Sequence, residues 1–308
     1  MHIKLSESDR ELITGVIDMH LHAMPCLLDR PFNELDIATQ ARDVGYRGLV
    51  LKSIFSPNAD RIELIRPLVP GIELFGSLVL NHSVGGLNPE AVRAAIGFDV
   101  KVVWLPTVHA AHHVAHFGVP SYPWQKQRGL PPRPVAPIEL LEPTGGLKQE
   151  VAEIIELCRS ANLVLGTGHV SLAEIMAVLK EARRIGYERV VITHVGWHAT
   201  DWPLDAMKKM LDLGCTFEFC VNPLMPNRQQ ARPKEFAARI RGIGPQNCTA
   251  ATDLGQHDNA HPIEGFRMWL RILQELGFSE SELDVMSRRN PARLLDLEGA
   301  PTVQSAAA

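Results

Sequence analysis

Two histidines separated by one residue follow a short apolar stretch near the N-terminus. Val16 and Ile17 begin a predicted buried strand. Because side chains along a strand alternate with period two, we expect Asp18, His20 and His22 on the same side of it. Two imidazoles at this spacing can grip one metal ion. An ordinary pair of core or surface histidines gives the same pattern, so the pair is informative only together with residues further along the chain.

The other histidines have a one-sided distribution. Apart from His2, each follows a predicted strand, and we expect none in a helix. They are His20 and His22 after the first strand, His82 after the third, His109, His112, His113 and His116 after the fourth, His169 after the fifth, His194 and His198 after the sixth, and His257 and His261 after the eighth. Scattered solvent histidines would also occupy helices, so the set indicates a metal site where the strands end. The four after the fourth strand are assigned mainly to packing, with one of them reaching substrate.

Asp253 closes the last apolar run, residues 248–252. A carboxylate at the end of a buried strand is costly unless it meets a cation, a hydrogen-bond network or water. A water bound to a metal ion would satisfy it.

Short apolar runs alternating with amphipathic stretches predict the scaffold that must position these residues. Eight strands are expected, at 16–19, 48–51, 73–80, 100–105, 163–166, 189–193, 216–220 and 248–252. Helix start signals lie between them, such as Asn88 before Pro89 and the capping box at 171–174. Strands alternating with helices at this length predict an α/β fold, a (β/α)8 TIM barrel formed by one domain over residues 1–298. Residues 299–308 are expected to be a disordered tail.

A segment rich in proline and histidine interrupts this alternation. Residues 107–146 follow the fourth strand and are far longer than an ordinary connection between a strand and a helix. Because such connections lie on the catalytic face of a barrel, the insertion is expected to be a lid or substrate loop. Its last part, residues 138–147, has the pattern of a small hairpin.

The order of these residues resembles the amidohydrolase superfamily of metal-dependent hydrolases. The resemblance lies in an HxH on strand one, a histidine on strands five and six, and an aspartate on strand eight. It spans nearly the whole barrel, and residues 290–295 are similar to the closing helix of the amidohydrolase-2 branch, which contains ACMSD-type decarboxylases. The resemblance implies metal-binding or water-orienting roles for His20, His22, His169 and His194, and makes Asp253 both metal ligand and proton acceptor. One or two divalent ions are expected, zinc first, with iron, manganese or cobalt as alternatives.

The fourth strand departs from the family pattern. Binuclear members often place a carbamylated lysine or a glutamate at its end, but residues 102–107 offer neither and Lys101 lies at the opposite end. A site with one ion and a site with two therefore both stay open.

Lys52 ends the second strand and is the one lysine that the strand pattern aims at the mouth of the barrel. Three roles stay open: a salt bridge to Asp18 or Glu218, a grip on a substrate anion, or a carbamate ligand from an unusual strand. Further candidates for substrate binding are Arg30, Asn81, His82 and His109.

The predicted activity is hydrolysis of an amide, cyclic amide, lactone or related C–N or C–O bond of a small molecule. A divalent ion can lower the pKa of bound water from ~15.7 to about 7. Asp253 would accept the proton of this water and pass it to the leaving group, while His194 would bind metal, orient the water or polarise the scissile carbonyl. A metal-dependent decarboxylase and a non-catalytic metal-binding barrel are the alternatives. The non-catalytic barrel would be expected to have lost at least one of the five candidate metal-site residues, which are His20, His22, His169, His194 and Asp253, and all five are present.

Composition and charge indicate which classes of binding partner to expect. A formal net charge of -4 gives no electrostatic reason to expect nucleic acid or a membrane surface. The charged N-terminus and the lack of any run of ~20 apolar residues favour a cytoplasmic protein. Five cysteines without a CxxC pair suggest neither disulfides nor a thiolate zinc site, and no nucleotide-binding or serine-hydrolase motif occurs. We expect a small-molecule substrate and a homo-oligomer.

Overall fold

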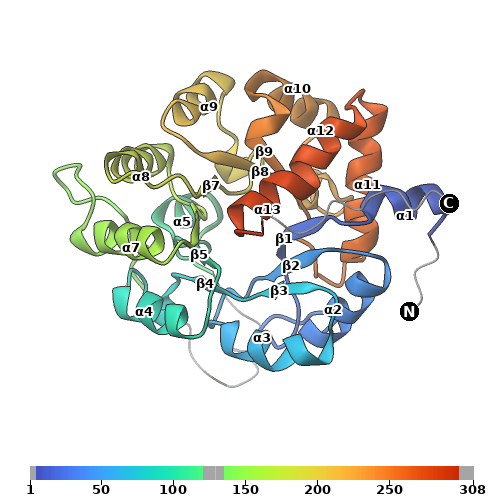
Figure 1. Ribbon diagram of the computed structural model, residues 1–308. Coiled ribbons are helices and arrows are strands. Elements are labelled where there is room, and N and C mark those ends of the chain that lie inside the picture. Colours follow the sequence, from blue (N-terminus) through green and yellow to red (C-terminus); the bar gives the residue numbers. More distant parts are fainter. Residues whose placement is uncertain (1–4, 121–128, 130–134, 298–308) are drawn as a thin grey trace.

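The computed structural model describes residues 5–120, 129 and 135–297, in which parallel strands alternate with helices (Figure 1). The strands are β1 (Ile17–Leu21), β2 (Gly48–Leu51), β3 (Glu73–Phe75), β4 (Ser77–Val79), β5 (Val102–Trp104), β6 (Val164–Gly166), β7 (Val190–Ile192), β8 (Thr216–Cys220) and β9 (Cys248–Ala251). They form two parallel sheets, β1-β2-β3 and β4-β5-β6-β7-β8-β9. The predicted α/β class and the positions of the predicted strands are confirmed, except that the third strand is divided.

Helices surround the strands. They are α1 (Glu7–Ile13), α2 (Glu34–Asp43), α3 (Ala59–Ile65), α4 (Pro89–Gly97), α5 (Ala111–Phe117), α7 (Gln149–Ser160), α8 (Leu172–Arg184), α9 (Leu204–Leu211), α10 (Pro233–Ile243), α11 (Pro262–Glu275), α12 (Glu280–Asp284) and α13 (Asn290–Leu294). The caps predicted at Asn88 and Ser171 are present, since both side chains accept backbone N–H groups of the first turn. None of the described helices is long and apolar enough to cross a membrane.

Gly76 divides the third predicted strand into β3 and β4. A Cβ atom at this position would lie 2.3 Å from the Cα of Ala59, the first residue of α3. The strand therefore passes α3 at a distance that only glycine permits, and its pairing changes there from β2 to β5.

Backbone hydrogen bonds join β1 to the chain that follows β9. The N–H of Asp253 donates to the carbonyl of His20 at 2.7 Å, and the N–H of His22 donates to the carbonyl of Leu254 at 2.8 Å. Within β1 the pairing register shifts between Asp18 and Leu21, which interrupts the strict alternation expected for Asp18, His20 and His22. The two ends of the strand order thus meet at the predicted metal-binding histidines.

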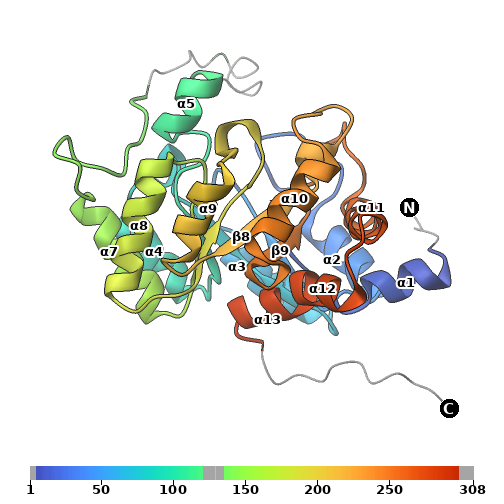
Figure 2. The same ribbon diagram turned by 90° about the horizontal axis from the view of Figure 1, so that it is seen from above.

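Apolar side chains fill both sides of the strands. The smaller of two buried clusters combines alternate strand residues, such as Val102 and Trp104, with Ala292 and Leu294 of α13. The larger cluster lies between the strands and the helices that surround them. Figure 2 shows α13 and α5 at opposite ends of the molecule. The α13 end is therefore closed by apolar packing.

The predicted insertion, residues 107–146, lies partly outside the described residues. Its described part contains α5, and an antiparallel bridge joins Leu141 to Leu147. Contrary to the expectation that no histidine lies in a helix, α5 contains His112, His113 and His116. The sequence analysis missed this helix for two reasons. The surrounding prolines favoured a loop, and seven residues are too few to display a clear apolar periodicity. The tail predicted at 299–308 lies outside the described residues.

Candidate metal centre

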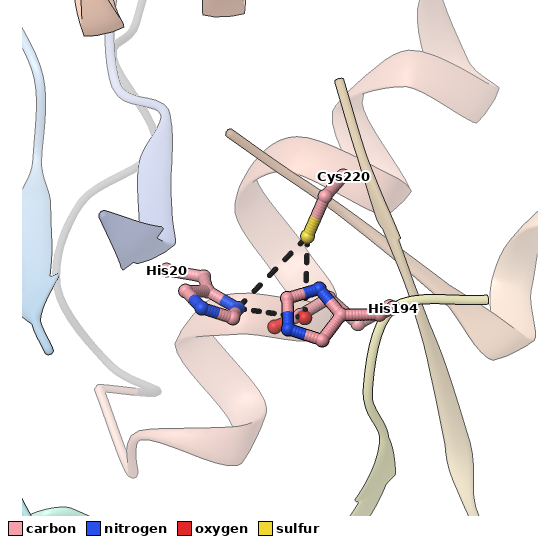
Figure 3. A group of neighbouring side chains, drawn as sticks. His20, His194 and Cys220 are labelled. Carbon is pink, nitrogen blue, oxygen red and sulfur yellow. Dashed lines mark hydrogen bonds and ion pairs between the residues drawn. The ribbon is translucent and has the colours of Figure 1, made fainter. Parts of the chain in front are cut away.

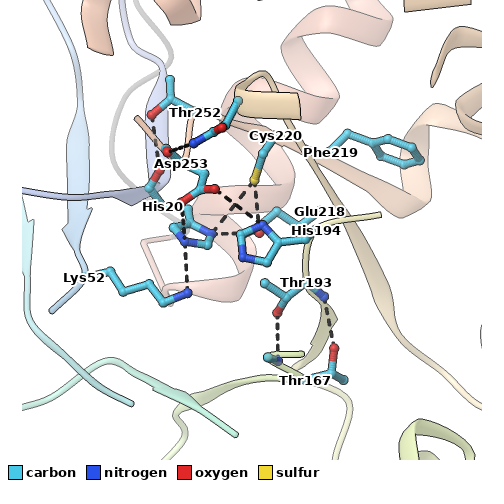
Figure 4. A network of polar contacts seen from close by, with 12 residues as sticks. His20, Lys52, Thr167, Thr193, His194, Glu218, Phe219, Cys220, Thr252 and Asp253 are labelled. Atoms are coloured by element: carbon cyan, nitrogen blue, oxygen red, sulfur yellow. Dashed lines mark hydrogen bonds and ion pairs between the residues drawn. The ribbon is translucent and has the colours of Figure 1, made fainter. Parts of the chain in front are cut away.

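Three side chains from the two ends of the strand order converge on one point. Asp253 Oδ1 lies 3.0 Å from His22 Nε2 and 3.3 Å from His20 Nε2. These ligand atoms lie within 4.8 Å of one another, close enough to hold one ion. On the other oxygen of the carboxylate, His194 Nδ1 lies 3.7 Å from Oδ2 (Figure 4).

The second ring nitrogen of each of the two β1 histidines has a fixed partner. His22 Nδ1 lies 2.9 Å from the carbonyl oxygen of Lys52, and His20 Nδ1 lies 2.9 Å from Glu218 Oε1. Both partners are acceptors, so each Nδ1 carries the proton and donates it. The Nε2 atom of each ring is therefore the one that faces Asp253. Outer partners of this kind are typical of metal-binding histidines, because they fix the tautomer and the ring orientation.

This arrangement suits a cation. Burial, together with the charge of Arg30, lowers the pKa of His22 to about 3, so its ring is neutral. The pKa of Asp253 lies well below its usual range despite burial, which by itself would raise it, so the group is a carboxylate. A lone pair of His22 and a carboxylate oxygen consequently face each other at 3.0 Å, and a divalent ion between them would replace that repulsion with two bonds.

His194 and Asp253 share an unusual backbone conformation. Their φ angles are 58° and 53°, in the left-handed region, and each residue lies two positions after the last residue of its strand. Such residues cost of order 1–3 kcal/mol and persist where the surroundings impose them. The carbonyl of Asp253 accepts from the side chains of Asn222 and Gln256, at 2.6 Å and 2.9 Å, which holds its turn in place.

Two threonines tie together the strand ends that carry His169 and His194. The N–H of Thr193 donates to Thr167 Oγ1 at 3.0 Å, and Thr193 Oγ1 accepts the N–H of Gly168 at 3.3 Å (Figure 4). His169 itself does not join either group of candidate ligands in the described part of the chain. Its Nδ1 lies 2.9 Å from Nδ1 of His113, and the two rings stack at 4.9 Å. The α5 helix of the insertion thus contacts the site directly.

Glu218 and Cys220 belong to the site although the sequence analysis assigned neither to it. With His20 and His194 they form a second, fully buried group of possible ligands (Figure 3). Burial raises the pKa of Cys220 well above its usual range, so it is a thiol, and it donates to Glu218 Oε1 at 3.3 Å. The available signal was the alternation within β8, where Thr216, Glu218 and Cys220 stand at every second position.

Lys52 contacts a metal-site histidine and not an acid. Its Nζ lies 3.0 Å from His20 Nε2 and 4.6 Å from the ring centre of Trp104. Among the described residues no ion pair joins it to Asp18 or Glu218, so the salt bridge considered above is wrong. Asp18 instead accepts from the hydroxyl and N–H of Thr252, at 2.6 Å and 3.1 Å, because its side chain reaches from β1 to the residue that follows β9. Burial lowers the pKa of Lys52, against the opposing effects of Asp253 and Glu218.

A cavity of about 380 Å³ opens beside these groups. Lys52 and Arg30, both predicted to bind substrate, line it together with His22, His169, His194 and Asp253. The other predicted substrate-binding residues, Asn81, His82 and His109, are not part of its described lining.

These three residues support the loops instead. Asn81 is fully buried, and its side chain donates to Thr107 Oγ1 and accepts from the Thr107 N–H, at 2.8 Å and 3.1 Å. His82 Nε2 lies 2.8 Å from the carbonyl of Ala136, and its ring packs against that of His109.

Comparison with known proteins decides the family. Residues 15–218 match the model of DUF6282, a family of unknown function. The chain belongs to DUF6282. No curated protein matches the sequence.

Three solved structures similar to this DUF6282 chain are described as an amidohydrolase, a probable dipeptidase and a phosphotriesterase homology protein. An amidohydrolase from Pseudomonas aeruginosa has 13% identity and a TM-score of 0.64, covering 94% of this chain and 98% of its own. A probable dipeptidase from the same organism has 12% identity and a TM-score of 0.63, covering 94% and 97%. A phosphotriesterase homology protein from Escherichia coli, complexed with phosphate in its active site, has 16% identity and a TM-score of 0.60, covering 92% and 99%. The resemblance to the amidohydrolase superfamily is thereby confirmed at the level of the fold.

Proposed function

We propose that this protein is a metal-dependent hydrolase that uses an activated water to cleave an amide, cyclic amide, lactone or related C–N or C–O bond of a small molecule. The observation that carries the proposal is the convergence of His20 Nε2 and His22 Nε2 on Asp253 Oδ1, at 3.3 Å and 3.0 Å. Two imidazole nitrogens and a carboxylate oxygen beside a cavity are the ligand types of a divalent-cation site.

His20, His22 and Asp253 would hold the ion, with His194 as a further ligand. Imidazole and carboxylate donors suit zinc, and a bound divalent ion supplies a water that loses its proton near neutral pH. Glu218 supports the site by orienting the ring of His20 through Nδ1.

Proton transfer falls to Asp253. Its carboxylate is ionised, its side chain is 18% exposed, and it lines the cavity, so it can accept a proton from the attacking water and return it to the leaving group. His194 borders the same cavity, and burial lowers its pKa to about 3, so its neutral ring can orient the water or the scissile carbonyl.

We further infer that the two sheets close into a (β/α)8 barrel with this site at its mouth. The bonds from Asp253 N–H to His20 and from His22 N–H to Leu254 support closure, since they link the first strand to the end of the last.

Metal content tests the proposal. Protein purified without chelators or nickel resin should contain about one or two equivalents of zinc or another divalent transition metal. The double variant His20→Ala/His22→Ala should lose the metal and melt at a lower temperature, because ligands stabilise only the folded state. His257→Ala, which alters an exposed histidine outside the cavity, should change neither property. Metal-free protein with full activity would overturn the proposal.

Turnover tests the role of Asp253. Asp253→Asn should lower kcat by a factor of about 10² to 10⁴ in protein that retains its metal, which is the usual loss for a positioned proton-transfer group. Substrates should be screened among cyclic amides, lactones, N-acyl amino acids and aromatic carboxylic acids in oxygen-18 water. Release of CO₂ with no label in any product would identify a decarboxylase instead.

A further inference from the structure

Arg30 is a buried cation without a carboxylate partner in the described part of the chain. Its side chain lies in the loop between β1 and α2, and the residue is 5% exposed. Within the described residues, the guanidinium makes one hydrogen bond, from Nη1 to the carbonyl of Gly255 at 3.2 Å, and its buried Nε has no hydrogen-bond partner there. Arginine stays protonated in proteins, and a buried charge is costly unless it is paired. The side chain therefore has unused capacity to bind an anion.

The backbone places this cation beside the metal centre. Gly255, whose carbonyl accepts from Arg30, follows Asp253 by two residues. A Cβ atom on Gly255 would lie 1.9 Å from the carbonyl oxygen of His22, so this segment is pressed against the HxH motif. Arg30 lines the same cavity as His22 and Asp253.

The rest of the lining also favours an anion. Lys52 and Arg228 add two basic side chains, and Asp253 is the single carboxylate among the described lining residues. A divalent ion at the metal centre would make the cavity more positive. Low-dielectric walls of one sign concentrate ligands of the opposite charge.

An apolar wall accompanies the positive charge. Trp197 and Phe117 line the cavity, and their rings stack with centroids 4.9 Å apart and an interplanar angle of 16°. A flat apolar group could pack against this surface.

We propose that Arg30 binds an anionic group of the substrate, a carboxylate or a phosphate, and that the substrate is a small anion with an aromatic or other apolar body. This inference rests on the proposed function, because it takes the bound anion to be a substrate, but the binding itself can be measured without turnover. A guanidinium paired with an oxyanion forms charge-assisted hydrogen bonds that fix the position of the ligand relative to the reacting group.

The test compares charged and neutral probes on the metal-loaded full-length protein by calorimetric titration. Benzoate and phenyl phosphate are the anions, and benzamide is the neutral analogue of benzoate. The wild-type protein should bind at least one anion more tightly than benzamide. The Arg30→Gln substitution should weaken the binding of that anion by roughly 10- to 100-fold and leave the affinity for benzamide nearly unchanged. The metal content of both proteins is measured alongside. Where it is equal, anion binding to the ion itself contributes equally to both, and the difference in affinity reports on Arg30.

A second readout separates ligand binding from a structural role. If Arg30 serves the ligand, Arg30→Gln should melt at the same or a higher temperature, because it removes an unpaired buried charge. Arg288→Gln is the matched control: Arg288 is a part-buried arginine bonded to the carbonyls of Thr14 and Leu12, so its loss should lower the melting temperature without changing anion affinity.

Two outcomes would overturn the inference. One is a wild-type protein that binds neither anion better than benzamide, and the other is an Arg30→Gln variant that keeps the full preference. Failure of the proposed function is a different result, because protein without metal or hydrolase activity could still show the Arg30-dependent preference.

Discussion

At the scale of single residues, Lys52 and a metal ion would both bind Nε2 of His20. Lys52 Nζ lies 3.0 Å from His20 Nε2, the nitrogen that faces Asp253. A protonated amine there donates to that nitrogen and repels a cation. Two of the roles considered from the sequence stay open, a grip on a substrate anion and a carbamate ligand, and the contact with His20 makes both depend on the amine losing its proton or moving.

Lys52→Met should raise metal affinity at pH 6. In the wild type, affinity should increase as the pH rises through the lowered pKa of Lys52, because the ammonium then disappears. The variant should lose this part of the pH dependence and bind metal more tightly than the wild type at the acidic end, because no ammonium then competes with the cation. Competition with a chromophoric chelator measures it, with Lys101→Met as the control at the opposite end of a strand. A Lys52→Met protein that loses metal and recovers it with short carboxylic acids would identify a carbamate ligand instead.

At the scale of elements, the metal centre depends on how β1 meets the chain after β9. Its ligands come from these two segments, and their backbones exchange hydrogen bonds on both sides of Leu21. Gly255 has a φ of 118° and passes so close to His22 that a side chain has no room. The distance between His22 and Asp253 is therefore set by main-chain packing.

Gly255→Ala should reduce both metal content and stability, since the added methyl group would displace His22. Gly214→Ala is the matched control, because Gly214 also has a positive φ, 87°, but nothing lies within 4 Å of its would-be Cβ. The control should cost only the left-handed strain, about 1–2 kcal/mol, and keep its metal. Elemental analysis and thermal melts measure the two effects. A Gly255→Ala protein with wild-type metal content would show that the close approach does not position His22.

At the scale of the whole molecule, the apolar packing of α13 closes one end of the strands, and the candidate metal centre lies at the other. Leu294 of α13 is fully buried in the smaller apolar cluster, whereas the cavity lies beside the polar residues that follow the strands. This division lets the fold gain its stability at one end, while the other end retains costly groups such as Arg30 and Asp253.

Leu294→Ala should therefore lower stability without affecting the metal centre. Loss of a fully buried leucine typically costs about 2–5 kcal/mol, depending on how far the cavity collapses. Leu68→Ala, at a residue that is 63% exposed, should change stability by less than about 0.5 kcal/mol. Denaturant unfolding gives the free energies, and metal content per folded molecule should match the wild type in both. Loss of metal in Leu294→Ala at low temperature would contradict the separation of the two ends.

The strands and several site residues could be predicted from the sequence because a buried strand appears in it as a short run of apolar residues. Each strand produced an apolar run, and the HxH pair and Asp253 stood where such runs end. The helix α5 left too short a record, which is why its three histidines were misplaced.

Long-range pairing decided the rest. Glu218 contacts His20 across 198 positions of the chain, and Asp253 contacts His22 across 231. No local pattern specifies which nitrogen of a ring faces an acid, that Lys52 bonds to His20 and not to Asp18, or that Arg30 has no acidic partner among the residues that the structure describes. Those facts depend on where the ends of separate strands come together, and only the packing of the complete chain determines that.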